Sequence, residues 1–354
     1  MRKNGALLIA VMLSGLTVPA LYAGAGSDAA AFLKIDAGAR AAAMSGAFVA
    51  VGDDASSVFY NPAGPALARN QELMLAHSEW LEGLRNEHAA YVHPVSPKLT
   101  IFTGLTALII PSMDKLDVGG YKTGSFSAMD GAAGAGFSWA FDDDLFGGLF
   151  IKTVYQQADT RKAFAYAGDF GLIKTYGNTV RLGLAAQNLG TPMKLYTESF
   201  DLPFTCRAGA AYRVRDMAWL IAELVKAGES DTAFAAGAEG EYSFAPRETI
   251  FARLGYKTGR SKNAGSGISA GVGLQSNDLR LDYAFSPFGD LGDTHRISLT
   301  LKFGSDRQDI APNRVSNKSY RGGKTPARSQ KRGAQNKGRK PASSGGDNEI
   351  MFMW

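Results

Sequence analysis

Residues 279–303 read LRLDYAFSPFGDLGDTHRISLTLKF, and they show most clearly the pattern on which the fold prediction rests. Apolar and polar residues alternate through 279–286 and again through 296–303, and a connection with proline and glycine separates the two runs. Because neighbouring side chains of a strand point to opposite faces, each run predicts a strand with one apolar face. A half-buried strand of a soluble protein shows the same alternation, so these two runs alone leave a membrane barrel and a soluble sheet open.

The same alternation recurs along most of the chain. Its runs are about ten residues or longer, and strands that cross a bilayer need about 9–11 residues. The polar faces repeatedly hold charges or glycine, which is typical of the wet interior of a membrane barrel. We expect fourteen strands, an even number, at residues 71–80, 85–94, 98–109, 127–141, 145–157, 164–175, 178–189, 203–214, 216–226, 231–244, 247–258, 265–275, 278–286 and 294–303.

The lengths of the predicted connections favour the barrel. Connections after even-numbered strands are tight, for example residues 95–97 and 276–277. Connections after odd-numbered strands are mostly longer, for example residues 110–126 and 190–202. Short turns at one rim and long loops at the other are typical of a bacterial outer-membrane barrel with both termini in the periplasm. We therefore predict an all-β, antiparallel transmembrane barrel over residues 71–303, with a secreted β-sandwich or propeller as the alternative.

The two ends of the chain differ from its middle. Arg2 and Lys3, the apolar residues 6–21 and the sequence Ala23-Gly24-Ala25 predict a cleaved signal peptide over residues 1–25, with an uncleaved anchor as the alternative. Residues 304–354 carry a net charge of +7 and predict a disordered tail in the periplasm. Because the whole chain carries +5, residues 1–303 sum to −2, which argues against a nucleic-acid partner.

The sequence lacks the common motifs of catalysis and of cofactor binding. One cysteine excludes a disulfide framework, and the four histidines show no metal-binding spacing. No GxSxG, P-loop or EF-hand pattern occurs. A mean hydropathy of −0.11 disfavours a bundle of transmembrane helices. We therefore predict that the protein is not an enzyme and takes no cofactor and no metal.

Two stretches near the N-terminus indicate a family. Residues 36–51 read DAGARAAAMSGAFVAV, and residues 53–64 read DDASSVFYNPAG. Both closely resemble PorV/PorQ-type outer-membrane proteins, which are relatives of the FadL-like transporters of long-chain fatty acids and hydrocarbons. Leu202-Pro203-Phe204 and residues 282–296 fit the same family. The resemblance implies a fourteen-stranded FadL-like barrel with an N-terminal segment, residues 26–70, folded into the lumen as a hatch. The basic tail departs from the family, whose members usually stop at the closing strand.

The candidate site residues belong to this hatch and to the inward faces of the strands. Asn61-Pro62 with Gly64 predicts a tight turn into the first strand. Asp53 and Asp54 are predicted either to pair with inward arginines or to form a capped turn at the periplasmic rim. The inward charged candidates are Arg181, Arg207, Arg213, Arg253, Arg280 and Asp282.

Two functions follow from the resemblance. One is transport of a hydrophobic small molecule through the outer membrane. The other is a role as a secretion accessory that contacts a type IX translocon or other envelope proteins. A secreted or outer-membrane structural or binding protein without transport activity is the alternative to both. In each outer-membrane reading the partners include the lipid of the outer membrane, and both termini face the periplasm.

Overall fold

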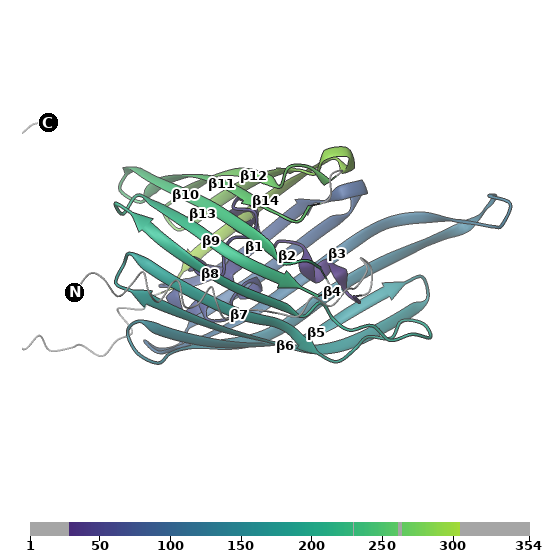
Figure 1. Cartoon of the computed structure of the whole chain (residues 1–354), viewed down its shortest axis with the longest axis horizontal. Helices are drawn as coiled ribbons and strands as arrows, with labels where there is room; N and C mark the ends of the chain where they lie inside the picture. Colours follow the sequence, from purple (N-terminus) through teal and green to yellow (C-terminus); the bar gives the residue numbers. More distant parts are fainter. Residues whose placement is uncertain (1–27, 229, 261–263, 305–354) are drawn as a thin grey trace, which may run out of the picture. The chain divides into compact units, whose positions relative to one another are not determined.

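The computed structural model describes residues 28–228, 230–260 and 264–304. Within these residues, fourteen antiparallel strands close into a barrel, so the predicted all-β class and strand number are confirmed (Figure 1). The predicted signal peptide lies outside the described residues, as does the predicted tail beyond Gly304. The strands are β1 Gln71–Glu79, β2 Arg85–Pro94, β3 Leu99–Leu116, β4 Lys122–Ala140, β5 Leu145–Ala158, β6 Arg161–Tyr176, β7 Val180–Gly190, β8 Thr205–Val214, β9 Ala218–Ala227, β10 Ala233–Ala245, β11 Glu248–Lys257, β12 Ile268–Ser276, β13 Leu279–Pro287 and β14 Asp293–Phe303.

Pairing of β1 with β14 closes the barrel. Gln71 lies opposite Phe303 and Glu79 opposite His295, so β1 begins at the same rim at which β14 ends. Closure leaves no unpaired strand edge, which removes the usual template for sheet aggregation. The short helices η4 (Leu81–Gly83) and η6 (Gly289–Leu291) lie in connections at the opposite rim.

The alternation of the sequence separates the two faces of the wall. In β13, Leu281 is 48% exposed on the outer face, while Asp282 on the inner face is 1% exposed. Large apolar side chains on the outer face are exposed, as expected for a surface that faces lipid. The described part of the chain contains no helix that is long and apolar enough to cross a bilayer.

The hairpin of β3 and β4 is longer than predicted. Residues 110–126 are expected from the sequence to form a loop, but β3 continues to Leu116 and β4 begins at Lys122, and the hairpin projects beyond its neighbours (Figure 1). The register shifts between Ile110 and Met113, next to Pro111, which cannot donate to the ladder. Beyond this shift the side chains are exposed on both faces, so the hairpin is held by backbone pairing and has no apolar alternation to reveal it.

The interior is filled by an N-terminal segment that we call the hatch (residues 28–70). It contains the short helices η1 (Ala31–Lys34), α2 (Ala39–Ala43), η2 (Ala55–Phe59) and η3 (Gly64–Leu67), drawn in purple in Figure 1. Phe48 and Tyr60 of the hatch pack with Trp219 and Ile221 of β9 in the largest apolar cluster. The hydrophobic core therefore lies between the hatch and the inner face of the wall, as the predicted inserted segment requires.

Candidate functional site

A closed ring of ion pairs joins the hatch to the wall. Three arginines and three acidic residues alternate around it, so the ring is neutral as a whole. Arg40 comes from α2 and Asp54 caps the start of η2, and the other four members come from β10, β11 and β13. In order, the ring is Arg40, Asp54, Arg280, Asp282, Arg253 and Glu239, which pairs with Arg40 again.

The geometry of the ring is that of strong charge-assisted hydrogen bonds. Arg40 binds Glu239 through two bonds, Nε to Oε2 at 2.8 Å and Nη2 to Oε1 at 2.6 Å. Arg253 reaches Glu239 at 2.6 Å and Asp282 at 2.8 Å, and its side chain is fully buried. Buried charges are costly unless each has its partners, and here the hatch supplies two of the partners that the wall needs. The ring therefore fixes the hatch to three strands at once.

Asp53 extends this network to a fourth strand. Its carboxylate lies 2.7 Å from Nη1 of Arg40 and 3.1 Å from Nη1 of Arg181 in β7. The Arg181 guanidinium also stacks over the ring of Trp219, 4.5 Å from its centroid. Burial alone would raise the pKa of Asp53, but the two guanidinium groups lower this pKa from 3.8 to about 2.

This depressed pKa predicts how the contact responds to acid. Because the pKa of Asp53 is lower in the docked state, ionised Asp53 stabilises the docked hatch. This stabilisation is complete above pH 3.8 and is lost as the pH falls through about 2. We expect the Trp219 fluorescence, taken as the difference from a Trp219→Phe variant, to stay constant from pH 7 to 4 and to change as the pH approaches 2. A change completed between pH 7 and 5 would contradict the pairing of Asp53 with Arg181.

Wall side chains also bind the backbone of the hatch. Glu223 in β9 accepts hydrogen bonds from the N–H groups of Phe48 at 2.7 Å and Val49 at 2.8 Å, and it pairs with Arg207 at 2.7 Å. Glu72 in β1 accepts from the N–H of Ala55 at 2.8 Å. These acidic residues satisfy backbone donors that the irregular hatch leaves unpaired.

The Asn61-Pro62 turn sits in a hollow made by glycines of the wall. The Asn61 amide donates to the carbonyls of Val49 at 2.8 Å and Leu172 at 3.2 Å. A Cβ atom on Gly148 would lie 1.9 Å from the Pro62 carbonyl oxygen, and one on Gly171 would lie 1.9 Å from Oδ1 of Asn61. At Gly148 the backbone of Pro62 leaves no room for a side chain, and at Gly171 the side chains of Asn61 and Pro62 leave none.

Gly64 has the same kind of restriction within the hatch. A Cβ atom there would lie 2.5 Å from Cβ of Ser57 and 2.8 Å from the carbonyl oxygen of Gly52. The start of η3 therefore lies directly against the chain that enters η2.

The predicted candidates fall into three groups. Asp53, Asp54, Asn61, Pro62 and Gly64 are hatch residues in contact with the wall or with each other. Arg181 pairs with Asp53, and Arg280 pairs with Asp54. Arg253 and Asp282 are connected to these pairs through the ring. Arg207 contacts the hatch through the Gly46 carbonyl and through its partner Glu223. Arg213 instead pairs with Glu241 and Asp216, and it is 23% exposed.

Sequence reasoning missed four residues of this network. Arg40 stands inside the quoted N-terminal motif but was not singled out. Glu72, Glu223 and Glu239 occupy inward positions of alternating runs, and that placement was the signal that would have identified them.

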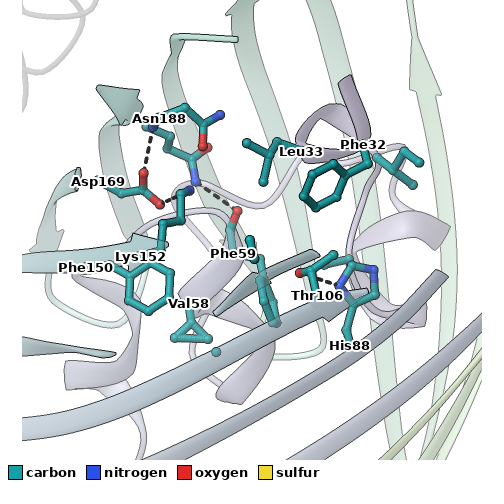
Figure 2. Close-up of a pocket in the computed structure, with 15 residues that line it drawn as sticks. Phe32, Leu33, Val58, Phe59, His88, Thr106, Phe150, Lys152, Asp169 and Asn188 are labelled. Carbon is teal, nitrogen blue, oxygen red and sulfur yellow. Dashed lines mark hydrogen bonds and ion pairs between the residues drawn. The ribbon is translucent and has the colours of Figure 1, made fainter. Parts of the chain in front are cut away.

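A narrow cavity lies between the hatch and strands β2 to β7 (Figure 2). Its volume is about 50 Å³, and it adjoins space that is open to solvent. Phe32 and Phe59 of the hatch and Phe150 of β5 form its aromatic walls. Its charged wall is the ion pair between Lys152 and Asp169, 2.7 Å apart.

A break in the ladder between β6 and β7 shapes the polar end of this cavity. The register shifts between Gly168 and Phe170, and Asn188 opposite has a positive φ of 61°. The Asn188 N–H donates to Oδ1 of Asp169 at 2.7 Å, so a side chain replaces the missing ladder bond. The bulge adds Asn188 to the inward-facing Gln187 in the cavity lining, whereas Asp169 faces inward by the regular alternation of β6.

A second cavity lies at the rim where the long connections emerge. Its volume is about 270 Å³, and Met193, Leu195, Tyr196 and Phe200 of the connection after β7 line it. The N–H of Ala30 binds Oε1 of Gln156 at 3.1 Å beside it. Because Ala29 lines this outer cavity while Phe32 lines the inner one, η1 lies between the two.

Comparisons with known proteins support the barrel type. A family model described as the uncharacterised protein family UPF0164 matches residues 23–104. The fold is similar to the Ralstonia pickettii toluene transporter TbuX, with 12% identity over 76% of this chain and 98% of that one and a TM-score of 0.54. It is also similar to the CymD monoaromatic hydrocarbon channel, with 11% identity over 75% of this chain and 97% of that one and a TM-score of 0.56. A Pseudomonas aeruginosa FadL homologue is similar with 12% identity over 75% of this chain and 98% of that one and a TM-score of 0.50. A search of curated proteins gave no match. The fold is thus that of FadL-type outer-membrane channels.

Proposed function

We propose that this chain forms an outer-membrane channel that binds small hydrophobic molecules and passes them across the membrane. The observation that carries the proposal is the cavity with aromatic walls, Phe32, Phe59 and Phe150, between a closed hatch and the wall of a FadL-type barrel. A water-filled porin needs an open lumen, whereas a hatch with its own apolar cluster and ion-pair ring suits selective binding. The solved structures of similar fold include proteins named as a toluene transporter and a monoaromatic hydrocarbon channel.

The proposed orientation follows from the connections. Both ends of the barrel lie at the rim with the tight turns, which we assign to the periplasm. A ligand then enters at the outer cavity beside Tyr196 and Phe200, moves past η1 and reaches the inner cavity. From there it leaves either sideways into the membrane or, once the hatch shifts, into the periplasm.

Ligand binding by the purified protein tests the proposal. We expect toluene to bind at a single class of sites and to be displaced by other small aromatic compounds. A Phe150→Asp variant places a charge in the aromatic wall and should weaken toluene binding by at least about 10-fold. A protein that is correctly folded but binds no apolar compound would instead support a structural role without transport.

The membrane setting gives a prediction on the wall itself. Replacing Leu281 by arginine puts a charge on the outer face and should destabilise the inserted barrel by about 2–4 kcal/mol near the bilayer midplane. Replacing Ala284 by arginine puts the same side chain on the inner face, where Ala284 packs against Ala39, Ala42 and Ala43 of α2. That variant should displace the hatch yet leave insertion intact.

Heat-modifiable gel migration and urea titration in lipid vesicles measure the first effect, and protease sensitivity of the hatch measures the second. Equal insertion defects in the two variants would contradict a lipid-facing outer surface.

A secretion-accessory role like that of PorV/PorQ-type proteins is the second candidate. The projecting β3–β4 hairpin favours it, because Val118 at its tip is fully exposed and Tyr121 is 75% exposed. An exposed apolar tip suits contact with another protein. Shortening the hairpin should then abolish cross-linking to envelope proteins while toluene binding stays unchanged. Loss of toluene binding without any change in cross-linking would favour the channel alone.

A further inference from the structure

Two buried polar atoms of the inner cavity have no hydrogen-bond partner among the described residues. They are Oδ1 of Asn188 in β7 and Nε2 of His88 in β2, and each of these residues is 4% exposed. Both residues line the cavity, and Figure 2 shows them at opposite ends of it. Buried polar atoms in native proteins are nearly always paired, so these two positions suit polar groups of a ligand.

The Asn188 atom is identified as an acceptor by its neighbour. Nδ2 of the same amide donates to the carbonyl oxygen of Pro203 at 2.9 Å, so the amide orientation is fixed and the free atom is the oxygen. An oxygen of this kind binds a ligand that donates an O–H or N–H.

Nε2 of His88 can form a hydrogen bond with a hydroxyl group in either tautomer of the ring. Nδ1 of His88 and Oγ1 of Thr106 are 3.1 Å apart, and either one can be the donor. A neutral imidazole therefore presents Nε2 either as a donor or as an acceptor. A hydroxyl group both donates and accepts, so it fits each tautomer.

The charges of the cavity are already neutralised. Lys152 is the one lysine or arginine among the described residues that line the cavity, and its ammonium is bound to Oδ2 of Asp169 at 2.7 Å. Oδ1 of Asp169 accepts from the Asn188 backbone. Because this ammonium is already paired, a carboxylate ligand would lose its hydration in the cavity without gaining an ion pair in return.

The remaining walls suit an aromatic ring. Phe32, Phe59 and Phe150 surround the space, and Phe59 packs edge-to-face on His88 with ring centroids 5.3 Å apart. A ligand ring can join this arrangement through further edge-to-face contacts.

We propose that the inner cavity binds a neutral monocyclic aromatic compound that carries a hydroxyl group, in preference to a plain hydrocarbon or an aromatic carboxylate. This inference rests on the proposed function and specifies its ligand class. The hydroxyl binds at Asn188 or His88, and the ring packs among the phenylalanines.

Binding of three matched ligands to the purified full-length protein tests this inference. Toluene, p-cresol and p-toluate share one methylated ring and differ in carrying no polar group, a hydroxyl or a carboxylate. We expect p-cresol to bind about 10-fold more tightly than toluene, as one added hydrogen bond to a buried group allows, and p-toluate to bind most weakly.

Variants then assign the preference to the two atoms. His88→Phe keeps a ring of similar size but removes Nε2, and Asn188→Gly keeps the positive φ but removes Oδ1. Each should lower the ratio of p-cresol affinity to toluene affinity several-fold. His77→Phe is the matched control, because His77 lies in neighbouring β1, is 45% exposed and pairs with Glu87. It should leave the preference unchanged.

The outcomes separate this inference from the proposed function. Toluene binding as tight as p-cresol, or p-toluate binding tightest, overturns the hydroxyl preference and leaves the channel proposal standing. An unchanged preference in both His88→Phe and Asn188→Gly also overturns it, since the hydroxyl then binds elsewhere. If none of the three ligands binds, the proposed function fails and the inference fails with it.

Discussion

Replacing Arg40 by methionine is expected to release the hatch from the wall while the barrel stays closed. Arg40 pairs with Asp53, Asp54 and Glu239, and its side chain is only 7% exposed. Methionine keeps much of the volume but leaves these acidic groups buried with too few cations. Removing one partner from a buried ion pair typically costs about 3–5 kcal/mol, which we expect to appear as lost docking energy of the hatch.

Limited proteolysis measures this loss, because an undocked hatch exposes its backbone to a protease. The control is Arg213→Met, which removes a partly exposed pair at the rim and should change docking by less than about 1 kcal/mol. In the Arg40→Met variant the ring keeps one negative charge in excess, although Glu239 still pairs with Arg253. The double variant Arg40→Met with Glu239→Gln removes this excess charge and should recover part of the lost protection. Equal protease sensitivity of the Arg40 and Arg213 variants would show that the ring does not hold the hatch.

Replacing Gly148 by alanine is expected to disrupt the same docking by steric means. The added methyl group would lie 1.9 Å from the Pro62 carbonyl oxygen and 2.1 Å from its carbonyl carbon. Both are backbone atoms, so no side-chain rotation can relieve the clash. Overpacking of this kind typically costs about 1–3 kcal/mol, and here the Asn61-Pro62 turn has to move away from β5. Phe59 precedes that turn and lines the inner cavity, so ligand affinity should fall together with hatch protection.

The matched control is Gly168→Ala in the adjacent strand β6. A Cβ atom at Gly168 would have its nearest neighbour at 3.7 Å, which is an ordinary contact. This variant should keep both ligand affinity and protease protection. Equal ligand affinity and protease protection in the Gly148→Ala and Gly168→Ala variants would contradict the close packing of the turn on the wall.

The strands could be predicted from the sequence because one physical requirement governs them all. Each strand has lipid on one side and a polar interior on the other, so its side chains alternate with a period of two. For example, residues 278–286 were predicted as a strand and β13 spans Leu279–Pro287. The β3–β4 extension was missed because residues beyond Ile110 leave that environment and lose the alternation.

The site could be predicted only in part, for a different reason. The inward position of Arg253, Arg280 and Arg213 follows from alternation, but their partners depend on the height of each residue along the barrel axis and on neighbours in other strands. Arg253 and Arg280 lie at the level of the hatch, whereas Arg213 lies near a rim and pairs there. The inner cavity depends on the bulge at Gly168–Phe170 and on the positive φ of Asn188, which no periodicity reveals.

Ion conductance across a planar bilayer measures whether the hatch closes the barrel. The comparison is between the full chain and a variant that lacks residues 36–55, with heat-modifiable migration confirming that both form barrels. The deletion removes Arg40, Asp53, Asp54 and the Phe48 contact with β9, and it leaves the wall residues to pair among themselves. We predict little conductance for the full chain and large, stable conductance steps for the deletion variant. Equal conductance of two properly folded barrels would contradict a hatch that closes the lumen.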